Sequence, residues 1–430
     1  MSGERSKVLL IGRGGREHAL AVALARSPSV TKLYVVPGNG GTAAMGGKTE
    51  NIALLEDDFA GQIVFAREHG VGLVVAGPDA VIALGAADAF TAAGIACFAP
   101  TKAAARLEWS KAFAKDFMTR HGIPTARYAV FRDLDSALAY VRRTDHPIVL
   151  KASGLAAGKG VVLPETVPEA ESLLNDIMLG GMFGAAGEEV VIEERLSGPE
   201  ASIHAFCDGK SFRTFPVGQD HKRVLDGDRG ANTGGMGVYA PAPVVSPALL
   251  AVIEQTVITP VLKGMAIEGT PFIGLLYPGL MLTPHGPRVI EFNCRFGDPE
   301  TQAMLPLLKS DLAAIFIDCI EGTLGRTEPQ WRGGSAVTVV AASGGYPGGF
   351  RKGIEIKGLE AAAALPETTV FHAGTTRDAA GRLVTDGGRV LSVTGTGATF
   401  AEARARAYAG IEKISFEGMH YRRDIGVQAP

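Results

Sequence analysis

Residues 289–302 read VIEFNCRFGDPETQ, and we interpret the first five as a strand. Because side chains alternate along a strand, Glu291 and Asn293 share one face, on the order of 7 Å apart at about 3.4 Å per residue. Ile290 and Phe292 are then expected in the core. A carboxylate and an amide at this spacing suit Mg²⁺ that phosphate oxygens also hold. The stretch therefore predicts a metal site for a nucleotide.

The second half of this stretch predicts the start of a helix. Asp298 is expected to cap the helix, Pro299 to take its first position and Glu300 to complement its dipole. We interpret Arg295 as a cation placed at developing phosphate charge.

A glycine-rich segment at 151–160 reads KASGLAAGKG. It is not a P-loop, because Gly160 stands where Ser or Thr would hold magnesium and an apolar strand follows instead of a helix. A glycine loop between two strands can instead close over a triphosphate, with Lys159 as a mobile cation and Lys151 fixed at the strand end. The alternative is a mobile surface hairpin.

Two further segments each leave an ordinary alternative open. Residues 190–200 read VVIEERLSGPE and suit a hinge whose main-chain groups bind adenine and whose later carboxylate binds ribose. The alternative is a solvated acidic loop. Residues 220–223 (DHKR) and 232–237 (NTGGMG) suit an anion nest of free amides, with a base and an acid that orient a small zwitterion, or else an ordinary turn.

Residues 12–18, GRGGREH, follow a strand and open a helix, as a Rossmann phosphate loop does. Glu17 replaces the third fingerprint glycine, and residues 37–39 (PGN) offer no acid after the second strand. Dinucleotide binding and hydride transfer are therefore disfavoured. Backbone amides with Arg13 or Arg16 suit one phosphomonoester, and a tight turn with solvated arginines is the alternative.

Strands alternate with helices over the first hundred residues, which predicts a parallel sheet. Helices are expected over 59–69, 80–93, 102–121, 248–268, 299–321 and 400–414. The composition is that of a globular chain: 46% of the 430 residues are hydrophobic, and the net charge of −3 gives no attraction to nucleic acid or anionic membrane. Four separated cysteines indicate a reduced, cytoplasmic protein, which we expect to be a monomer.

The order of these segments resembles the glycinamide ribonucleotide synthetase family, ATP-grasp enzymes of purine synthesis. Residues 295–302 look like the family signature, and 219–223, 232–237 and 421–426 also match. Three positions depart from the family pattern, namely Ser153 for the usual Asp, Asp79 for the usual Glu and Pro278 for a small residue.

The resemblance implies an ATP-grasp fold of the α/β and α+β classes, with an N-terminal parallel-sheet (Rossmann-like) domain and a C-terminal β-rich domain. The implied domains are an N-terminal domain over 1–103, a central ATP-grasp domain over 104–125 and 194–325, a lid subdomain over 126–193 and a C-terminal domain over 326–430. The implied reaction joins glycine to 5-phosphoribosylamine through an acyl phosphate, with ATP as co-substrate and Mg²⁺ or Mn²⁺ as cofactor.

The resemblance also implies roles for single residues. Glu291 and Asn293 would hold the metal. The nucleotide would contact Lys111, Lys151, Gly158, Lys159, Glu193, Leu196 and Glu200, and Arg295, Lys151 and Lys159 would act in phosphoryl transfer. The other substrates would contact Gly12, Gly14, Gly15, Arg16, Asn39, Asp220, Lys222, Gly234 and Gly235.

Two other hypotheses stay open. One is an ATP-grasp ligase for a different acid or amine. The other is a non-catalytic nucleotide sensor, which the intact pair Glu291 and Asn293 argues against because a binder would not need the metal pair.

Overall fold

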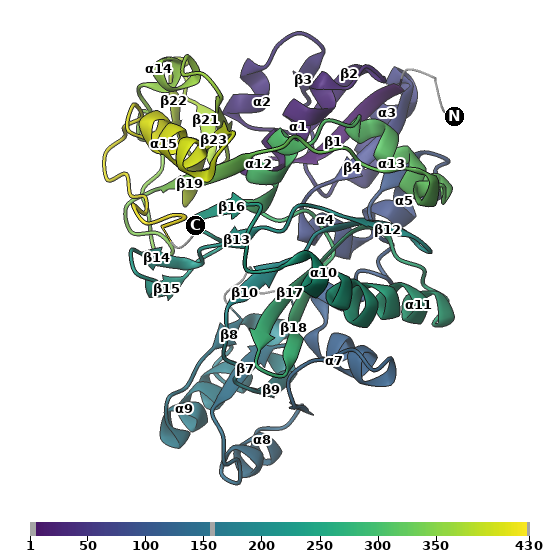
Figure 1. Cartoon of the computed structure of the whole chain (residues 1–430), viewed down its shortest axis with the longest axis vertical. Helices are drawn as coiled ribbons and strands as arrows, with labels where there is room; N and C mark the ends of the chain where they lie inside the picture. Colours follow the sequence, from purple (N-terminus) through teal and green to yellow (C-terminus); the bar gives the residue numbers. More distant parts are fainter. Residues whose placement is uncertain (1–5, 155–159, 428–430) are drawn as a thin grey trace.

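Five parallel strands form the N-terminal sheet of the computed structural model, which describes residues 6–154 and 160–427 (Figure 1). The strands are β1 (Ser6–Gly12), β2 (Val30–Pro37), β3 (Thr49–Asn51), β4 (Val71–Ala76) and β5 (Ala96–Phe98), in the order β3-β2-β1-β4-β5. The helices are α1 (Gly15–Arg26), α2 (Gly40–Ala44), α3 (Phe59–His69), α4 (Asp79–Leu84) and α5 (Ala86–Ala92). The predicted parallel α/β sheet is confirmed.

Helix α3 begins and ends where its sequence predicts. Asp58 Oδ1 accepts a hydrogen bond from the Gly61 amide at 2.9 Å, so this side chain caps the first turn. Gly70 follows the last helical residue with φ of 64°, a left-handed conformation that favours glycine and ends the helix.

A separate antiparallel sheet of four strands forms the lower part of the molecule in Figure 1. Its strands are β6 (Tyr128–Phe131), β7 (Ile148–Ala152), β8 (Val161–Val162) and β9 (Val190–Glu194), in the order β6-β9-β7-β8. Helices α8 (Leu134–Val141) and α9 (Val167–Met178) pack on it, and their buried side chains form a core of their own with those of the sheet. We call this unit the lid sheet.

The central sheet carries Glu291 and Asn293, the two predicted metal ligands. It is antiparallel and contains β10 (Glu200–Ser202), β11 (Ala205–Asp208), β12 (Phe212–Thr214), β17 (Ile273–Thr283) and β18 (Gly286–Asn293). Gly279 pairs with Glu291 but Leu280 pairs with Val289, so Ile290 is the extra residue of a β-bulge. The prediction that Ile290 fills the core is wrong, because the bulge gives that place to Val289, and Ile290 is only half-buried.

A fourth sheet joins the central and C-terminal parts of the chain. The antiparallel order is β13-β16-β19-β23-β20. The strands are β13 (Gln219–Asp220), β16 (Gly237–Ala240), β19 (Ser335–Ala342), β20 (Thr368–His372) and β23 (Arg389–Gly397). Helix α15 (Phe400–Ile411) packs on β23, and two hairpins, β14 (Arg223–Leu225) with β15 (Arg229–Asn232) and β21 (Thr375–Arg377) with β22 (Leu383–Thr385), lie beside this sheet. The short helix α14 (Leu359–Ala363) precedes β20.

Two predicted helices of the first half are broken. The helix expected over 80–93 divides into α4 and α5 because Gly85 is left-handed, with φ of 98°. The helix expected over 102–121 divides into α6 (Arg106–Trp109) and α7 (Lys111–Arg120), because Ser110 is extended and caps α7.

Two further long helices were expected in the second half. The segment 299–321 contains α12 (Glu300–Met304), a 3₁₀ turn (Leu305–Leu307) and α13 (Leu312–Glu321), and α13 has its own cap at Asp311. The segment 248–268 is helical throughout, with α10 (Pro247–Ile253), a π-turn (Glu254–Ile258) and α11 (Thr259–Ile267).

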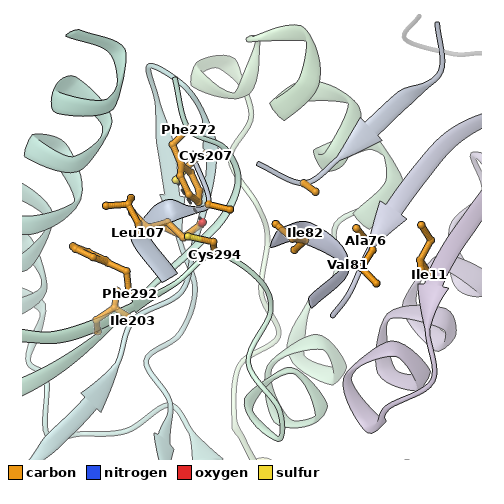
Figure 2. Close-up of a cluster of buried hydrophobic side chains, with 14 of the residues drawn as sticks. Ile11, Ala76, Val81, Ile82, Leu107, Ile203, Cys207, Phe272, Phe292 and Cys294 are labelled. Atoms are coloured by element: carbon orange, nitrogen blue, oxygen red, sulfur yellow. Dashed lines mark hydrogen bonds between the residues drawn. The ribbon is translucent and has the colours of Figure 1, made fainter. Parts of the chain in front are cut away.

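The largest buried cluster extends from the N-terminal sheet into the central sheet. Figure 2 shows Ile11, Ala76 and Ile82 on one side, with Leu107 and Phe292 farther along the same cluster. These parts of the chain are therefore held together by continuous apolar packing.

Among the helices of residues 6–154 and 160–427, the one over 247–267 is long and apolar enough to cross a membrane by composition, with a mean hydropathy of 1.4. Its Val257, Ile258 and Val261 are fully buried in the core. We interpret it as a core helix.

Candidate functional site

A cavity of about 720 Å³ lies between the lid sheet and the central sheet, with Asp79 reaching it from the N-terminal domain. Many of the predicted site residues line it together although they come from distant segments. These are Lys111, Lys151, Glu193, Leu196, Glu200, Asp220, Lys222, Gly234, Glu291, Asn293 and Arg295.

Glu291 and Asn293 lie at the carboxyl end of β18, beyond the bulge. Burial would raise the pKa of Glu291, but the nearby cations Lys222 and Lys151 outweigh it and hold this pKa below its usual value. Asn293 is buried, and its Oδ1 accepts a hydrogen bond from Arg295 Nη2 at 2.9 Å, which leaves one lone pair. A charged carboxylate and an amide oxygen at the cavity wall fit a divalent cation.

The described residues contain no group of three or more His, Cys, Asp or Glu side chains arranged for a metal. Glu291 and Asn293 can therefore supply only part of a cation's ligands. The donor set suits a metal that takes its other oxygens from phosphate and water, as Mg²⁺ commonly does at nucleotides.

Arg295 is held beside the metal pair by Glu108, which the sequence did not single out. The two form an ion pair, with Arg295 Nε 3.2 Å from Glu108 Oε1. The other oxygen of Glu108 accepts from the Cys294 amide at 2.7 Å. Burial would lower the pKa of Arg295, and Glu108 reverses this effect, so the guanidinium stays charged at the wall.

Three lysines and one carboxylate form what we call the lysine cluster: Lys111, Lys115, Lys151 and Glu193. Glu193 is 3% exposed, and its two oxygens lie 2.7 Å from Lys115 Nζ and 2.9 Å from Lys151 Nζ. Lys151 Nζ also donates to the Ile290 carbonyl at 3.0 Å, which connects the lid sheet to β18. Burial lowers the pKa of Lys115 to about 8 against the attraction of Glu193.

Three carboxylates and one lysine form the carboxylate cluster: Glu200, Asp220, Glu300 and Lys222. Lys222 Nζ lies 3.1 Å from Glu200 Oε2, and Tyr277 donates its hydroxyl hydrogen to Glu300 Oε1 at 2.6 Å. Burial raises the pKa of Asp220 to about 7; Glu300 and Glu200 act in the same direction and Lys222 opposes them. This part of the wall gains negative charge as the pH rises through neutrality.

Glu193 and Leu196 were expected at the nucleoside. The carboxylate of Glu193 is paired with two lysines, so the backbone of β9 and the side chain of Leu196, two residues beyond this strand, are the groups that could contact a nucleoside there. A nucleoside contact of Glu193 stays a prediction.

The N-terminal glycine loop lies outside the cavity lining and is filled by Glu17. Its carboxylate accepts from the Gly14 amide at 2.7 Å and from Arg16 Nε at 2.5 Å. Arg16 Nη1 also donates to the Phe296 carbonyl at 3.0 Å. A Cβ at Gly12, where φ is 133°, would lie 2.3 Å from Glu17 Cγ, so Gly12 makes room for the glutamate. The phosphate-binding role of this loop stays a prediction.

Asn39 and Gly15 make close contacts within the protein. Asn39 Oδ1 caps α2 by accepting from the Gly41 amide at 2.8 Å, and its Nδ2 donates to the carbonyls of Arg13 at 2.9 Å and His372 at 2.8 Å. A Cβ at Gly15 would lie 2.5 Å from Gln302 Nε2. These contacts join the loop to the C-terminal domain and to α12, and a substrate contact of either residue stays a prediction.

Gly234 and Gly235 were expected to present free amides to an anion. The Gly234 amide donates to the Tyr346 hydroxyl at 3.2 Å, and the Gly235 amide donates to Thr233 Oγ1 at 3.0 Å. The interpretation as a nest of free donors is therefore wrong, since both amides have acceptors in the protein. Gly234 lines the cavity and Gly235 lies behind it.

Asp298 does not cap a helix, contrary to the prediction. Pro299 takes the capping position, and α12 begins at Glu300, so Asp298 lies one residue outside. Its Oδ1 accepts instead from Gln302 Nε2 at 2.8 Å. Glu300 is 3% exposed and faces Tyr277, so it belongs to the cavity wall.

Gly158 and Lys159 lie outside the described residues, so their expected part in a closing loop stays a prediction. The strand end before them is described. The Ser153 carbonyl accepts from the Lys111 amide at 2.9 Å, and Ser153 Oγ accepts from the Ala112 amide at 3.1 Å. The serine at this position thus ties the lid sheet to the first turn of α7.

Sequence reasoning missed Glu108, Lys115 and Tyr277. Lys115 had a usable signal, because it lies four residues after Lys111 and therefore on the same face of one helix. Glu108 and Tyr277 had none, since their partners are about 187 and 23 residues away along the chain.

Three family models match almost the whole chain. They are the N domain (residues 6–108), the ATP-grasp (A) domain (109–301) and the C domain (336–428) of phosphoribosylglycinamide synthetase. The phosphoribosylamine–glycine ligase of Allochromatium vinosum is 50% identical over 98% of both chains, and that of Caulobacter vibrioides is 49% identical over 99% of both.

Solved structures agree. A phosphoribosylamine–glycine ligase from Thermotoga maritima matches with a TM-score of 0.82 and 35% identity, over 97% of this chain and 100% of that one. A biotin carboxylase domain from Hydrogenobacter thermophilus matches with a TM-score of 0.72 and 16% identity, over 97% and 91%, which shows a shared fold alone. The chain belongs to the phosphoribosylglycinamide synthetase family of ATP-grasp ligases.

Proposed function

We propose that the chain joins glycine to 5-phosphoribosylamine at the expense of ATP, giving N1-(5-phosphoribosyl)glycinamide, ADP and phosphate in purine biosynthesis. The observation that carries this proposal is one cavity whose wall holds the lysine cluster, Glu291 with Asn293, and the carboxylate cluster together. Full-length relatives with this activity in their names support it.

A divalent cation, Mg²⁺ or Mn²⁺, would be held by Glu291 and Asn293. When bound, it would neutralise charge on the phosphate oxygens during phosphoryl transfer.

Lys111 and Lys151 are proposed to face the triphosphate of ATP, since both side chains line the cavity beside Glu291. Leu196 and Glu200 would contact the nucleoside. Arg295 would stabilise the charge that develops on the transferred group, because Glu108 holds its guanidinium at the wall in a charged form.

Glycine is a small zwitterion, and the carboxylate cluster suits its ammonium group. Asp220 and Glu300 would attract the ammonium, and Lys222 would attract the carboxylate. The sugar phosphate of phosphoribosylamine is proposed to lie toward the glycine loop at Gly12–Arg16.

The chemistry then proceeds in two displacements. A carboxylate oxygen of glycine attacks the γ-phosphorus of ATP, the bond to the bridging oxygen breaks, and ADP leaves. The amine nitrogen of phosphoribosylamine next attacks the carbonyl carbon of glycyl phosphate, phosphate leaves with the C–O bonding pair, and the nitrogen loses a proton. No covalent bond to the protein is needed, so positioning and charge do the work.

The proposal is tested by measuring ADP release with glycine alone, phosphoribosylamine alone and both, and by replacing glycine with alanine or serine. We expect sustained release only with both substrates and glycine as the acid. Equal turnover with another amino acid would favour a different ATP-grasp ligase, and nucleotide binding without turnover would favour a sensor.

The localisation, oligomeric state and partners of the chain are proposals too. We propose a cytoplasmic monomer that acts on small molecules and needs neither nucleic acid nor membrane. The domain limits of 103, 125, 193 and 325 are likewise proposed, and β13 and β16 share one sheet with C-terminal strands across the last of them.

A further inference from the structure

Three parts of the chain meet at Asp298. The residue belongs to the segment 295–302 of the central region and lines the cavity. A Cβ built on Gly14 would lie 3.4 Å from Asp298 Oδ2, and the nearby Arg16 lowers the pKa of the same carboxylate. Asp298 therefore lies against the N-terminal glycine loop.

Arg389 brings the C-terminal domain to this point. It is the first residue of β23, and its Nη1 donates to the Asp298 carbonyl at 2.6 Å and to the Gly234 carbonyl at 2.7 Å. Its Nη2 lies 3.5 Å from Asp298 Oδ2. One guanidinium thus holds two separate segments of the cavity wall.

The glycines at 234 and 235 make this contact possible. A Cβ at Gly234 would lie 2.9 Å from Arg389 Cζ, and a Cβ at Gly235, where φ is 113°, would lie 2.5 Å from Pro299 Cδ. A larger residue at Gly234 would force the Arg389 guanidinium to shift, and one at Gly235 would clash with the Pro299 ring. The glycine pair therefore serves the seating of Arg389 and Pro299.

Arg389 is absent from the cavity lining, whereas its partners Gly234 and Asp298 are both part of it. Burial would raise the pKa of Asp298, but Arg389 and Arg16 outweigh it and keep the carboxylate charged. The arginine thus acts on the wall only through other residues, by geometry and by charge.

We propose that Arg389 is a positioning residue, which fixes Asp298 and, through it, the glycine loop at Gly14–Arg16 for the binding of the sugar phosphate. The inference rests on the proposed function, because the ligand of that loop is taken to be the phosphate of phosphoribosylamine. It gives the C-terminal domain a part in substrate binding, although that domain lies away from the lysine cluster.

The experiment compares Arg389→Lys and Arg389→Ala with the full-length wild-type chain. Lysine keeps the charge but cannot reach both carbonyls and the carboxylate with one planar group. For Arg389→Ala we expect KM for phosphoribosylamine to rise about tenfold, the order of effect of losing charged hydrogen bonds. KM for ATP should stay within about twofold, and Arg389→Lys should lie between the wild type and Arg389→Ala.

A matched control is Arg406→Ala. Arg406 is also a half-buried arginine of the C-terminal domain, but its Nη1 donates to the Thr396 carbonyl within that domain. The Arg406→Ala variant should leave the KM values for ATP, glycine and phosphoribosylamine unchanged. The thermal unfolding midpoint of every variant separates a loss of stability from a loss of binding.

Calorimetric titration with ribose 5-phosphate gives a readout that does not depend on turnover. Weaker binding to both Arg389 variants, with normal binding to Arg406→Ala, supports the inference. A lower unfolding midpoint with unchanged KM for phosphoribosylamine overturns it, and so does an equal rise in all three KM values. If Arg389→Ala does not fold, the same criteria apply to Arg389→Lys. A wild-type chain without ligase turnover would instead sink the proposed function.

Discussion

The two charged clusters of the cavity wall are built in opposite ways. The lysine cluster groups Lys111, Lys115 and Lys151 with the single carboxylate of Glu193, whereas the carboxylate cluster groups Glu200, Asp220 and Glu300 with the single ammonium of Lys222. Each cluster contains one group of the opposite sign, which limits the cost of placing three like charges close together.

The difference shows how one cavity can hold substrates of opposite charge. A polyphosphate is attracted to the lysine cluster and an ammonium group to the carboxylate cluster. Glu291 is influenced by both, because Lys222 from one and Lys151 from the other lower its pKa. Under the proposed function, Glu291 would hold the metal between the two substrates, where phosphoryl transfer would take place.

The largest effect is expected for Glu291→Gln, which removes the charge between the clusters while keeping the shape. We expect kcat to fall about 100-fold or more, since one group that stabilises developing charge is commonly worth that much. The unfolding midpoint should change little. Steady-state turnover over a range of Mg²⁺ concentrations checks this, and near wild-type turnover would remove the metal assignment.

A pair of lysine substitutions separates the clusters. Lys111→Met should raise KM for ATP about tenfold and leave KM for glycine unchanged, because a charged contact to phosphate is lost. Lys222→Met should do the reverse, raising KM for glycine. If both variants raise the same KM, the clusters do not divide the substrates as proposed.

The pH dependence of the two KM values should also differ. The pKa of Asp220 is raised by burial to about 7, so its carboxylate forms as the pH rises and KM for glycine should fall a few-fold between pH 6 and 8. The pKa of Lys115 is lowered by burial to about 8, so its charge is lost above that pH and KM for ATP should rise. Parallel profiles for the two substrates would contradict this division.

The raised pKa of Asp220 also makes the stability of the fold depend on pH. The folded pKa of Asp220 exceeds the ordinary value of 3.8, so the folded state binds more protons between about pH 4 and 7. The contribution of this group to the free energy of unfolding therefore falls as the pH rises through that window. In Asp220→Asn, which cannot titrate, this part of the pH dependence should disappear.

The smallest effect concerns the joint between the lid sheet and α7. Ser153→Ala removes the acceptor of the Ala112 amide and should lower the free energy of unfolding by about 1 kcal/mol, the usual loss for a capping oxygen. Denaturant unfolding measures it. Because no charge of either cluster changes, kcat should stay near the wild-type value, and a large loss of turnover would show that Ser153 does more than hold the joint.

Periodic segments could be predicted from the sequence, and their interruptions could not. The parallel sheet and the helix over 59–69 follow from local patterns and caps. The breaks at Gly85 and Ser110 depend on how each helix end packs, which hydrophobic spacing does not record. The bulge at Ile290 arises from pairing with β17, so strict alternation placed the wrong side chain in the core.

Among the residues of the candidate site, too, only those with a local sequence signal could be predicted. Glu291, Asn293 and Lys151 could be predicted because their spacing on strands and their chemistry are local. Glu108 and Arg389 could not, since they act on residues far away along the chain, and the fold alone brings them together. The glycines at 234 and 235 were misinterpreted for the same reason, because their close neighbours come from remote parts of the sequence.

The most direct test is a crystal structure with a non-hydrolysable ATP analogue, Mg²⁺ and glycine. The phosphates should lie against Lys111 and Lys151, the metal should lie on Glu291 and Asn293, and the ammonium of glycine should face Asp220 and Glu300. Phosphates against the carboxylate cluster, or a metal bound away from Glu291, would contradict the division of the cavity.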